Sequence, residues 1–414
     1  MRKKPITNSK RNYPFSRLNF DRKTHFLGGL HWDVLARVSS ILLSTLIIIM
    51  LARGLGANGF ADFQISLTVA SIILWMGDFG LLTRIMNLSG GLADSELKKA
   101  WNLRLTLTTL TVLVYFGLAT SITGETNSYL VVALVVDGFV DANYNHRMLE
   151  HKGKLSLWVQ PLRKGFQVFL IFIIIFISVD MTGILLFYVF LIPSMILLIW
   201  DVRNVGGLSP NLDYTYLKST FNYWFQSGSS YIGNLDYFLL NFYGYSSLIA
   251  LIALPKKIIN SISLIGTVTN PRNQNNVARN GKVSKHNIQL IIYATVIGLI
   301  SSLFSLFFMK SLFQTLFNLD LTSNQAFLVS CVLVSTPVQM LVVGINSLFF
   351  GLEKSRYPVL ASYIGSLIYI LLVVLVLVIN YATVMLVGVL IITRLLVELA
   401  ILLYFSPQLS RNLK

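Results

Sequence analysis

Residues 51–90 read LARGLGANGFADFQISLTVASIILWMGDFGLLTRIMNLSG. A short glycine-rich turn around Arg53 is followed by a predominantly apolar run. Such a run is long enough to cross the roughly 30 Å hydrocarbon core of a bilayer as a helix, and residues 32–52 before the turn fit the same template. This stretch therefore predicts two membrane-spanning helices joined by a tight turn.

The same template recurs along the whole chain, with short polar breaks between matches. The expected spans are 32–52, 60–84, 100–122, 129–149, 156–178, 183–201, 217–240, 246–268, 287–309, 325–349, 358–379 and 383–405. The break between the sixth and seventh spans contains Gly206, Gly207 and Pro210, which favour a linker. We therefore predict an all-α integral membrane protein with about twelve spans in two six-helix bundles. The predicted parts are a basic tail 1–30, bundles 31–201 and 217–405, the linker 202–216 and a tail 406–414.

Composition excludes a water-soluble fold. Hydrophobic residues make up 55% of the 414 residues and charged residues 12%, whereas soluble chains carry roughly a quarter charged residues. The formal net charge is +16, but the basic residues are scattered between apolar spans, so no nucleic acid is expected as a partner. Membrane lipids and an anionic substrate fit better. Cys331 is the one cysteine, which excludes an intramolecular disulfide and a CxxC-type metal site.

The distribution of lysine and arginine predicts the orientation. The N-terminal tail is basic and lacks the apolar region of a cleaved signal peptide. Four of the odd-numbered breaks, 124–128, 179–182, 241–245 and 380–382, contain no Lys or Arg, and only Arg53 and Lys310 stand near the outer ends. Basic loops stay in the cytoplasm, and Trp101 and Trp224 fall at cytoplasmic span ends, where indoles are common. Both termini of this multi-pass protein are therefore expected in the cytoplasm.

Two halves with equal numbers of spans also suggest an internal repeat. Moving the second half over the first by 188 residues places Gly244 on Gly56, at matching turns between spans. The repeat is expected from hydropathy, because the overlay shows little identity.

Two stretches resemble bacterial lipid-linked oligosaccharide flippases. In 51–90 the resembling elements are the Ala-Arg-x-Leu-Gly turn, an aromatic residue soon after it and the Gly-Asp-Phe-Gly-Leu end of the second span. In 234–271 the segments NLDYFLLNFYG, IALPKKI and TVTNP resemble the family's seventh and eighth helices. These flippases form the polysaccharide transporter family of the multidrug, oligosaccharidyl-lipid and polysaccharide (MOP) exporter superfamily.

The resemblance implies a MATE-like fold in which two bundles enclose a central cavity and alternate in access. It further implies transport of undecaprenyl-pyrophosphate-linked oligosaccharide repeat units, for O-antigen, lipopolysaccharide, capsule or exopolysaccharide, to the outer leaflet. No enzymatic activity and no bound cofactor are implied, and the drive would be a proton or sodium gradient or the membrane potential. Polymerase and chain-length proteins of the same pathway are expected partners.

Six cations at membrane depth are the candidate pyrophosphate ligands, since each charge placed there costs at least about 2.5–3.5 kcal/mol without partners. They are Arg37, Arg163, Lys164, Lys256, Lys257 and Arg394. Arginine binds phosphate bidentately and lysine binds it as a point charge. Lys256 and Lys257 follow Pro255, which favours a kinked helix of the kind that forms transporter sites.

Each of these cations also has a purely structural interpretation. Lys256 or Lys257 could pair with an aspartate, and Arg394 lies one helical turn from Glu398. Arg163 and Lys164 could extend to lipid head groups, and Arg37 could pair with Asp33.

Five carboxylates are candidates for ion coupling or for counter-ions to those cations. They are Asp78, Asp137, Asp141, Asp236 and Glu398. Asp137 and Asp141 share a helix face, and Asp78 could instead pair with Arg84.

Two other classes of function stay open. One is a membrane polysaccharide polymerase or ligase, although no long outer loop is present to house a catalytic site. The other is a MATE-type multidrug exporter, whose cationic substrates would favour a less cationic cavity.

No GxxxxGK[ST] phosphate loop and no HExxH zinc motif occurs, so no catalytic or metal-binding residue is predicted. Selectivity for the sugar is expected from scattered polar side chains such as Tyr223, Gln226, Asn234 and Asn241.

Overall fold

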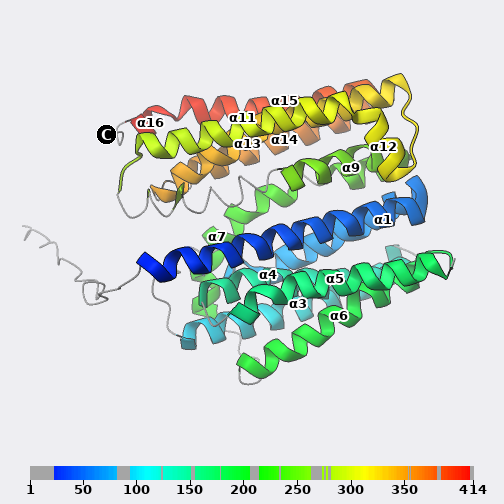
Figure 1. Ribbon diagram of the computed structural model, residues 1–414, viewed down its shortest axis with the longest axis horizontal. Helices are drawn as coiled ribbons and strands as arrows, with labels where there is room; N and C mark the ends of the chain where they lie inside the picture. The colour runs from blue at the N-terminus through cyan, green and yellow to red at the C-terminus, as the bar shows by residue number, and fades with distance from the viewer. Residues whose placement is uncertain are drawn as a thin grey trace, which may run out of the picture.

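The computed structural model describes residues 23–81, 94–122, 125–150, 154–177, 179–205, 214–232, 235–262, 273–274, 277, 281–352, 354, 356–379 and 384–410. Within these ranges every element is a helix (Figure 1). The N-terminal helices are α1 (Lys23–Asp78), α3 (Asp94–Ile122), α4 (Glu125–Glu150), α5 (Lys154–Phe176) and α6 (Gly183–Val205). The C-terminal helices are α7 (Tyr214–Ile232), α8 (Asp236–Phe242), α9 (Ser246–Ile262), α11 (Lys285–Phe307), α12 (Met309–Phe317), α13 (Ser323–Gly351), α14 (Arg356–Val378), α15 (Val384–Tyr404) and α16 (Pro407–Ser410).

The helices form two bundles, which we call the N-lobe (α1 and α3–α6) and the C-lobe (α7–α15). In the N-lobe, α1 packs against α3, α4 and α5, and α4 packs against α6. In the C-lobe, α13 packs against α9, α11 and α15, and α14 packs against α7 and α15. Figure 1 shows the two lobes one above the other, with the start of α1 and the C-terminus at the same end. This arrangement confirms the predicted all-helical fold of two bundles.

Two glycine turns reverse the chain at corresponding places in the two lobes. The first two predicted spans are one element, α1, interrupted by non-helical backbone at Gly56, where φ is 66°. Gly244, between α8 and α9, has a φ of 81°. Glycine tolerates this left-handed backbone because it has no Cβ. The two turns lie 188 residues apart, the offset at which the sequence suggested a repeat.

Seven helices in the described residues are long and apolar enough to cross a membrane. One of them, Val38–Asp78, is 41 residues long and covers the first two predicted spans. Other predicted spans fall on helices that are more polar or shorter than these seven. Span 100–122 lies in α3, span 129–149 in α4, span 217–240 in α7 and α8, and span 246–268 overlaps α9. These helices carry most of the charged residues considered below, which lowers their hydropathy.

Four local expectations need correction. The predicted span 217–240 is divided between α7 and α8, and the segment after span 287–309 contains the short helix α12. Stretches rich in Met and Phe, such as 303–309, are typical of lipid-facing surface, yet Met309 is 8% exposed. Trp101 is also buried, at 6% exposure, so it packs inside the protein instead of anchoring a membrane interface.

The outer surface of the lobes is apolar, as lipid contact requires. Leucine and phenylalanine side chains on several helices are more than half exposed, among them Leu42, Leu113, Leu162, Phe176, Phe307 and Leu367. An exposed apolar surface of this extent is unfavourable in water, so it supports the assignment as a multi-pass membrane protein.

The lobes touch at the Gly56 turn inside α1 and at the Asp78 end of α1, and α1 also packs against α7 and α9. Near Gly56, the Arg53 guanidinium of the N-lobe donates a hydrogen bond to the Thr315 carbonyl of α12. At the other end the indole rings of Trp75 (α1) and Trp224 (α7) stack at 4.7 Å with an interplanar angle of 6°. Each indole N–H donates to the backbone carbonyl of the other tryptophan, at 3.2 Å. The lobes are therefore in direct contact at both of these places.

Gly80 allows the tryptophan contact to form, so its replacement by alanine is expected to loosen it. Its φ is 75°, and a Cβ there would stand 2.7 Å from the Thr220 carbonyl oxygen and against the Trp224 backbone. Left-handed backbone alone costs a side-chain-bearing residue about 1–2 kcal/mol. Gly80→Ala should lower the melting temperature of the purified protein, whereas Gly117→Ala, in open space on α3, should leave it unchanged or raise it. Equal melting temperatures would contradict the close packing at Gly80.

Candidate functional site

Asp137 of α4 is the centre of a buried polar network in the N-lobe. Its carboxylate accepts hydrogen bonds from Arg163 (2.6 Å), Gln167 (2.5 Å) and Ser194 (2.7 Å). Lys164 Nζ is 3.4 Å from its second oxygen. The donors come from α5 and α6, so this one carboxylate ties three helices together.

Asp141, one turn further along α4, shares the same cations. It forms ion pairs with Arg163 and with Lys164, whose Nζ is 3.5 Å from its carboxylate. Gln160 also donates to it, at 2.8 Å. Asp137 and Asp141 therefore face the same partners, as their spacing of four predicted. Two cations and two carboxylates leave this N-lobe network without net charge.

Asp236 plays a similar part in the C-lobe. Its side chain is fully buried and lies 3.3 Å from Lys256 Nζ. The Tyr369 hydroxyl donates to the carboxylate at 2.8 Å, and the Tyr237 backbone N–H does so at 2.9 Å. Lys256 also lies over the Tyr237 ring, 4.8 Å from its centroid. The structural alternative, in which Lys256 pairs with an aspartate, is thus present in this structure.

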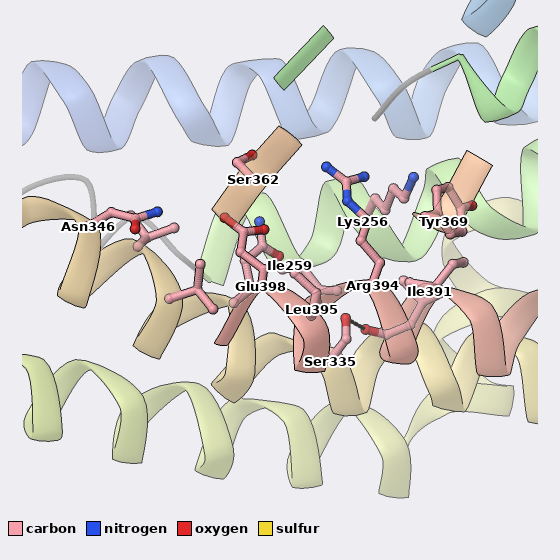
Figure 2. A pocket seen from close by; sticks show the side chains of 14 residues that line it. Lys256, Ile259, Ser335, Asn346, Ser362, Tyr369, Ile391, Arg394, Leu395 and Glu398 are labelled. Atoms are coloured by element: carbon pink, nitrogen blue, oxygen red, sulfur yellow. Dashed lines mark hydrogen bonds between the residues drawn. The ribbon is translucent and has the colours of Figure 1, made fainter. Parts of the chain in front are cut away.

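Lys256 also lines a cavity of about 340 Å³ inside the C-lobe, between α9, α13, α14 and α15. Polar side chains from several helices surround it, among them Ser335, Gln339, Asn346, Ser362, Arg394 and Glu398. Figure 2 shows the charged ends of Lys256 and Arg394 pointing the same way, with Glu398 on the same helix as Arg394. The cavity therefore presents donors and acceptors within an otherwise apolar lobe.

Arg394 and Glu398 do more than pair with each other. The Arg394 guanidinium is 5.7 Å from the centroid of the Tyr369 ring and lies within electrostatic range of Lys256. Glu398 is 6% exposed, feels the charge of Arg394 and accepts a hydrogen bond from Asn346. Both residues line the C-lobe cavity.

The two adjacent lysines of α9 serve different lobes. Successive residues are about 100° apart around a helix axis, so neighbouring side chains diverge. Lys256 points into the C-lobe cavity, whereas Lys257 is close enough to Lys164 of the N-lobe for the two to repel electrostatically. Lys257 therefore connects the charged groups of the two lobes.

Together these groups form what we call the central charged cluster. Its members are Arg163, Lys164, Lys256, Lys257, Arg394, Asp137, Asp141, Asp236 and Glu398. Five cations and four carboxylates give these side chains a net charge of +1. Within the described ranges, no group of three His, Cys, Asp or Glu side chains could hold a metal ion.

Asp78 lies apart from this cluster. Its carboxylate is 2.8 Å from Arg104 Nε, and the Arg104 guanidinium lies 4.4 Å from the centroid of the Phe139 ring. The alternative partner, Arg84, falls outside the described residues. Asp78 is the last residue of α1, near the stacked tryptophans, and its partner Arg104 lies on α3 of the N-lobe.

All nine charged residues of the cluster were thus named from the sequence, but their neutral partners were not. Arg37 cannot be placed, because its side chain is outside the described part of the chain. The missed polar residues are Gln167, Ser194, Asn346 and Tyr369, together with Arg104. The signal for Arg104 was present: it is a charge near the same end of its span as Asp78, in the next helix.

The known proteins most informative for comparison are solved structures. No family model and no curated protein matches the sequence. The lipid II flippase MurJ, in an inward closed conformation, superposes with a TM-score of 0.68 at 11% identity, covering 92% of this chain and 88% of its own. A MOP superfamily transporter from Pyrococcus furiosus, described as having a binding pocket of reverse polarity, superposes with a TM-score of 0.63 at 14% identity. The superposition covers 92% of this chain and 95% of that transporter. An inward-facing multidrug resistance MATE family transporter superposes with a TM-score of 0.60 at 16% identity, covering 91% of this chain and 98% of that transporter. At these identities the likeness shows a common fold, so the chain has the fold of the MOP transporters and flippases.

Proposed function

We propose that this protein is a flippase that moves undecaprenyl-pyrophosphate-linked oligosaccharide repeat units from the cytoplasmic to the outer leaflet of a bacterial inner membrane. The two lobes would alternate access to the cargo, and the product would enter synthesis of O-antigen, capsule or exopolysaccharide. The fold shared with a lipid II flippase and the resemblance of 51–90 and 234–271 to oligosaccharide flippases support this function.

The observation that carries the proposal is a row of cations that crosses from one lobe to the other. The row runs from Lys164 through Lys257 and Lys256 to Arg394, and neighbouring members are within electrostatic range. Cations this close repel strongly where the dielectric constant is low. Counting Arg163, the central charged cluster holds five cations and four carboxylates, so a pyrophosphate beside Lys257 would bring negative charge to a cluster whose formal charge is positive.

Pyrophosphate is the part of the cargo that most needs such a site. A charge costs at least about 2.5–3.5 kcal/mol at the bilayer centre, and the head group must pass that depth. Lysine ammonium groups held by both lobes can accompany the phosphates whichever side is open. A cationic drug would instead meet repulsion, which counts against multidrug export.

The carboxylates divide into two proposed roles. Asp137 and Asp141 fit counter-ions, because Arg163 and Lys164 hold them within the N-lobe. Asp236 and Glu398 lie beside the C-lobe cavity and are the candidates for coupling to a proton or sodium gradient or to the membrane potential. The polymerase and chain-length proteins of the pathway would act on the translocated product.

Reconstitution tests the function directly. The assay uses vesicles that contain undecaprenyl-pyrophosphate-GlcNAc with a fluorescent group and a quencher that cannot cross the membrane. In protein-free vesicles the quencher reaches only the lipid of the outer leaflet. With purified protein in the membrane, inner-leaflet lipid should also reach the quencher, so a larger share of the fluorescence should be lost. Vesicles with Lys310→Ala, a change at an exposed α12 position, should behave as wild type. No protein-dependent exposure would overturn the proposal. Longer glycans forming in the vesicles would favour a polymerase, and transport of ethidium without lipid movement would favour a multidrug exporter.

A further inference from the structure

We infer that the C-lobe cavity holds a neutral sugar ring of the cargo, the one attached to the pyrophosphate. This inference rests on the proposed function and adds a second site to it. The anion would lie at the row of cations between the lobes, and the sugar would enter the cavity lined by α9, α13, α14 and α15.

The lining has the mixed character that a sugar requires. A pyranose ring offers apolar C–H surfaces and a rim of hydroxyl groups, each of which is both donor and acceptor. Val332, Val342 and Ile391 provide apolar walls, while Gln339 and Ser362 provide polar groups. An amide supplies two donors and an acceptor, and a hydroxyl supplies one donor and two lone pairs.

The charges around the cavity favour a neutral ring. Lys256 and Arg394 are matched by Asp236 and Glu398, so these four side chains carry no net charge. Glu398 would repel the carboxylate of an acidic sugar, whereas it can accept hydrogen bonds from the hydroxyls of a neutral one. The cavity thus differs from the row between the lobes, where Lys257 adds positive charge.

The cavity is also the right size for a small group. Its volume of about 340 Å³ is near the lower end of the roughly 300–1,000 Å³ that small-molecule sites occupy. It admits a single ring more readily than an oligosaccharide, so the remaining sugars have to lie outside it. Selection by the cavity would act on the first sugar and tolerate variation further along the glycan.

Position along α9 links the two sites. Lys256 lines the cavity and Lys257 beside it faces the N-lobe, so a phosphate at Lys257 is next to the cavity. The first sugar is bonded directly to the pyrophosphate, which matches this adjacency. The polar residues suggested by the sequence do not line the cavity: Tyr223 lies on α7 and Asn241 at the end of α8, while the Gln226 and Asn234 side chains are outside the described residues.

Binding of two lipids to the purified protein in lipid nanodiscs separates the sites. Wild type should bind undecaprenyl-pyrophosphate-GlcNAc at least about tenfold more tightly than undecaprenyl-pyrophosphate, as one or two hydrogen bonds would provide. Gln339→Leu, which keeps the size but removes the amide, should reduce this preference about fivefold and leave binding of the sugar-free lipid unchanged. Val343→Phe, which fills the cavity, should remove the preference by a different physical effect. Gln314→Leu, at an exposed position of α12, is the matched control and should bind both lipids as wild type does.

The outcomes separate this inference from the function on which it rests. If neither lipid binds to wild type, the proposed function fails. If the sugar-free lipid binds and the added sugar gives no preference, or if both cavity variants keep the preference, the sugar site is wrong and the flippase proposal stands. Tighter binding of the same lipid bearing a uronic acid would overturn the assignment to a neutral ring.

Discussion

Lys257→Ala is expected to lower the rate of lipid movement in the vesicle assay by about 10–100-fold, the equivalent of one hydrogen bond to a charged group. Lys257 lies near Lys164 of one lobe and Lys256 of the other, so its loss removes the cation that connects the two halves of the proposed anion site. The same change also removes the repulsion of Lys257 by Lys164 and Lys256, so the melting temperature of the variant is measured beside transport to show that the protein is folded.

Two further variants make this result specific. Lys257→Arg keeps the charge and should retain more transport than Lys257→Ala, although a guanidinium is larger and has a different donor geometry. Lys310→Ala removes a lysine from the exposed surface of α12 and should transport normally. Transport at the wild-type rate by folded Lys257→Ala protein would remove the main support for pyrophosphate binding between the lobes.

Asp137→Ala is expected to have the largest effect on stability, a loss of about 3–5 kcal/mol, because removing one partner of a buried ion pair leaves an uncompensated charge. The change would leave Arg163 and Lys164 inside the N-lobe with Asp141 as their remaining carboxylate partner among the side chains that the structure describes. Gln167 and Ser194 would also lose their acceptor. The yield of folded protein and its melting temperature in detergent measure this effect.

Asp320→Ala is the matched control, since Asp320 is exposed in the segment after α12. It should leave both the yield and the melting temperature unchanged. A folded Asp137→Ala protein with wild-type stability would show that the network does not hold α4, α5 and α6 together. Arg163 and Lys164 would then be available as direct ligands of the cargo.

Hydropathy predicted the helices well because it depends on local sequence. A bilayer requires a run of apolar residues for each crossing, and such runs are visible without any tertiary contact. The same criterion did not indicate α12, which is too short to be a span, or the division between α7 and α8. It also predicted lipid contact for Met309, whose burial depends on the helices that pack around it.

The candidate site was predicted less completely, because hydropathy does not give the rotation of a helix about its axis. Arg394 and Glu398 were identifiable as one pair from their spacing, but the participation of Asn346 and Tyr369 depends on the packing of α13 and α14 against α15. Likewise, Lys256 could be expected to pair with an aspartate, yet nothing in the spacing selected Asp236, which is 20 residues away.

The stacked rings of Trp75 and Trp224 belong to different lobes, and this gives the protein an optical reporter of its own motion. Aromatic rings in contact couple their electronic transitions, which alters circular dichroism and fluorescence in the near ultraviolet. These two are among only six tryptophans in the chain, so the background from other indoles is small. Separation of the lobes at this end would uncouple the rings, whereas opening at the Arg53 end alone would not. Spectroscopy on the unlabelled protein could therefore tell which end opens at each stage of transport.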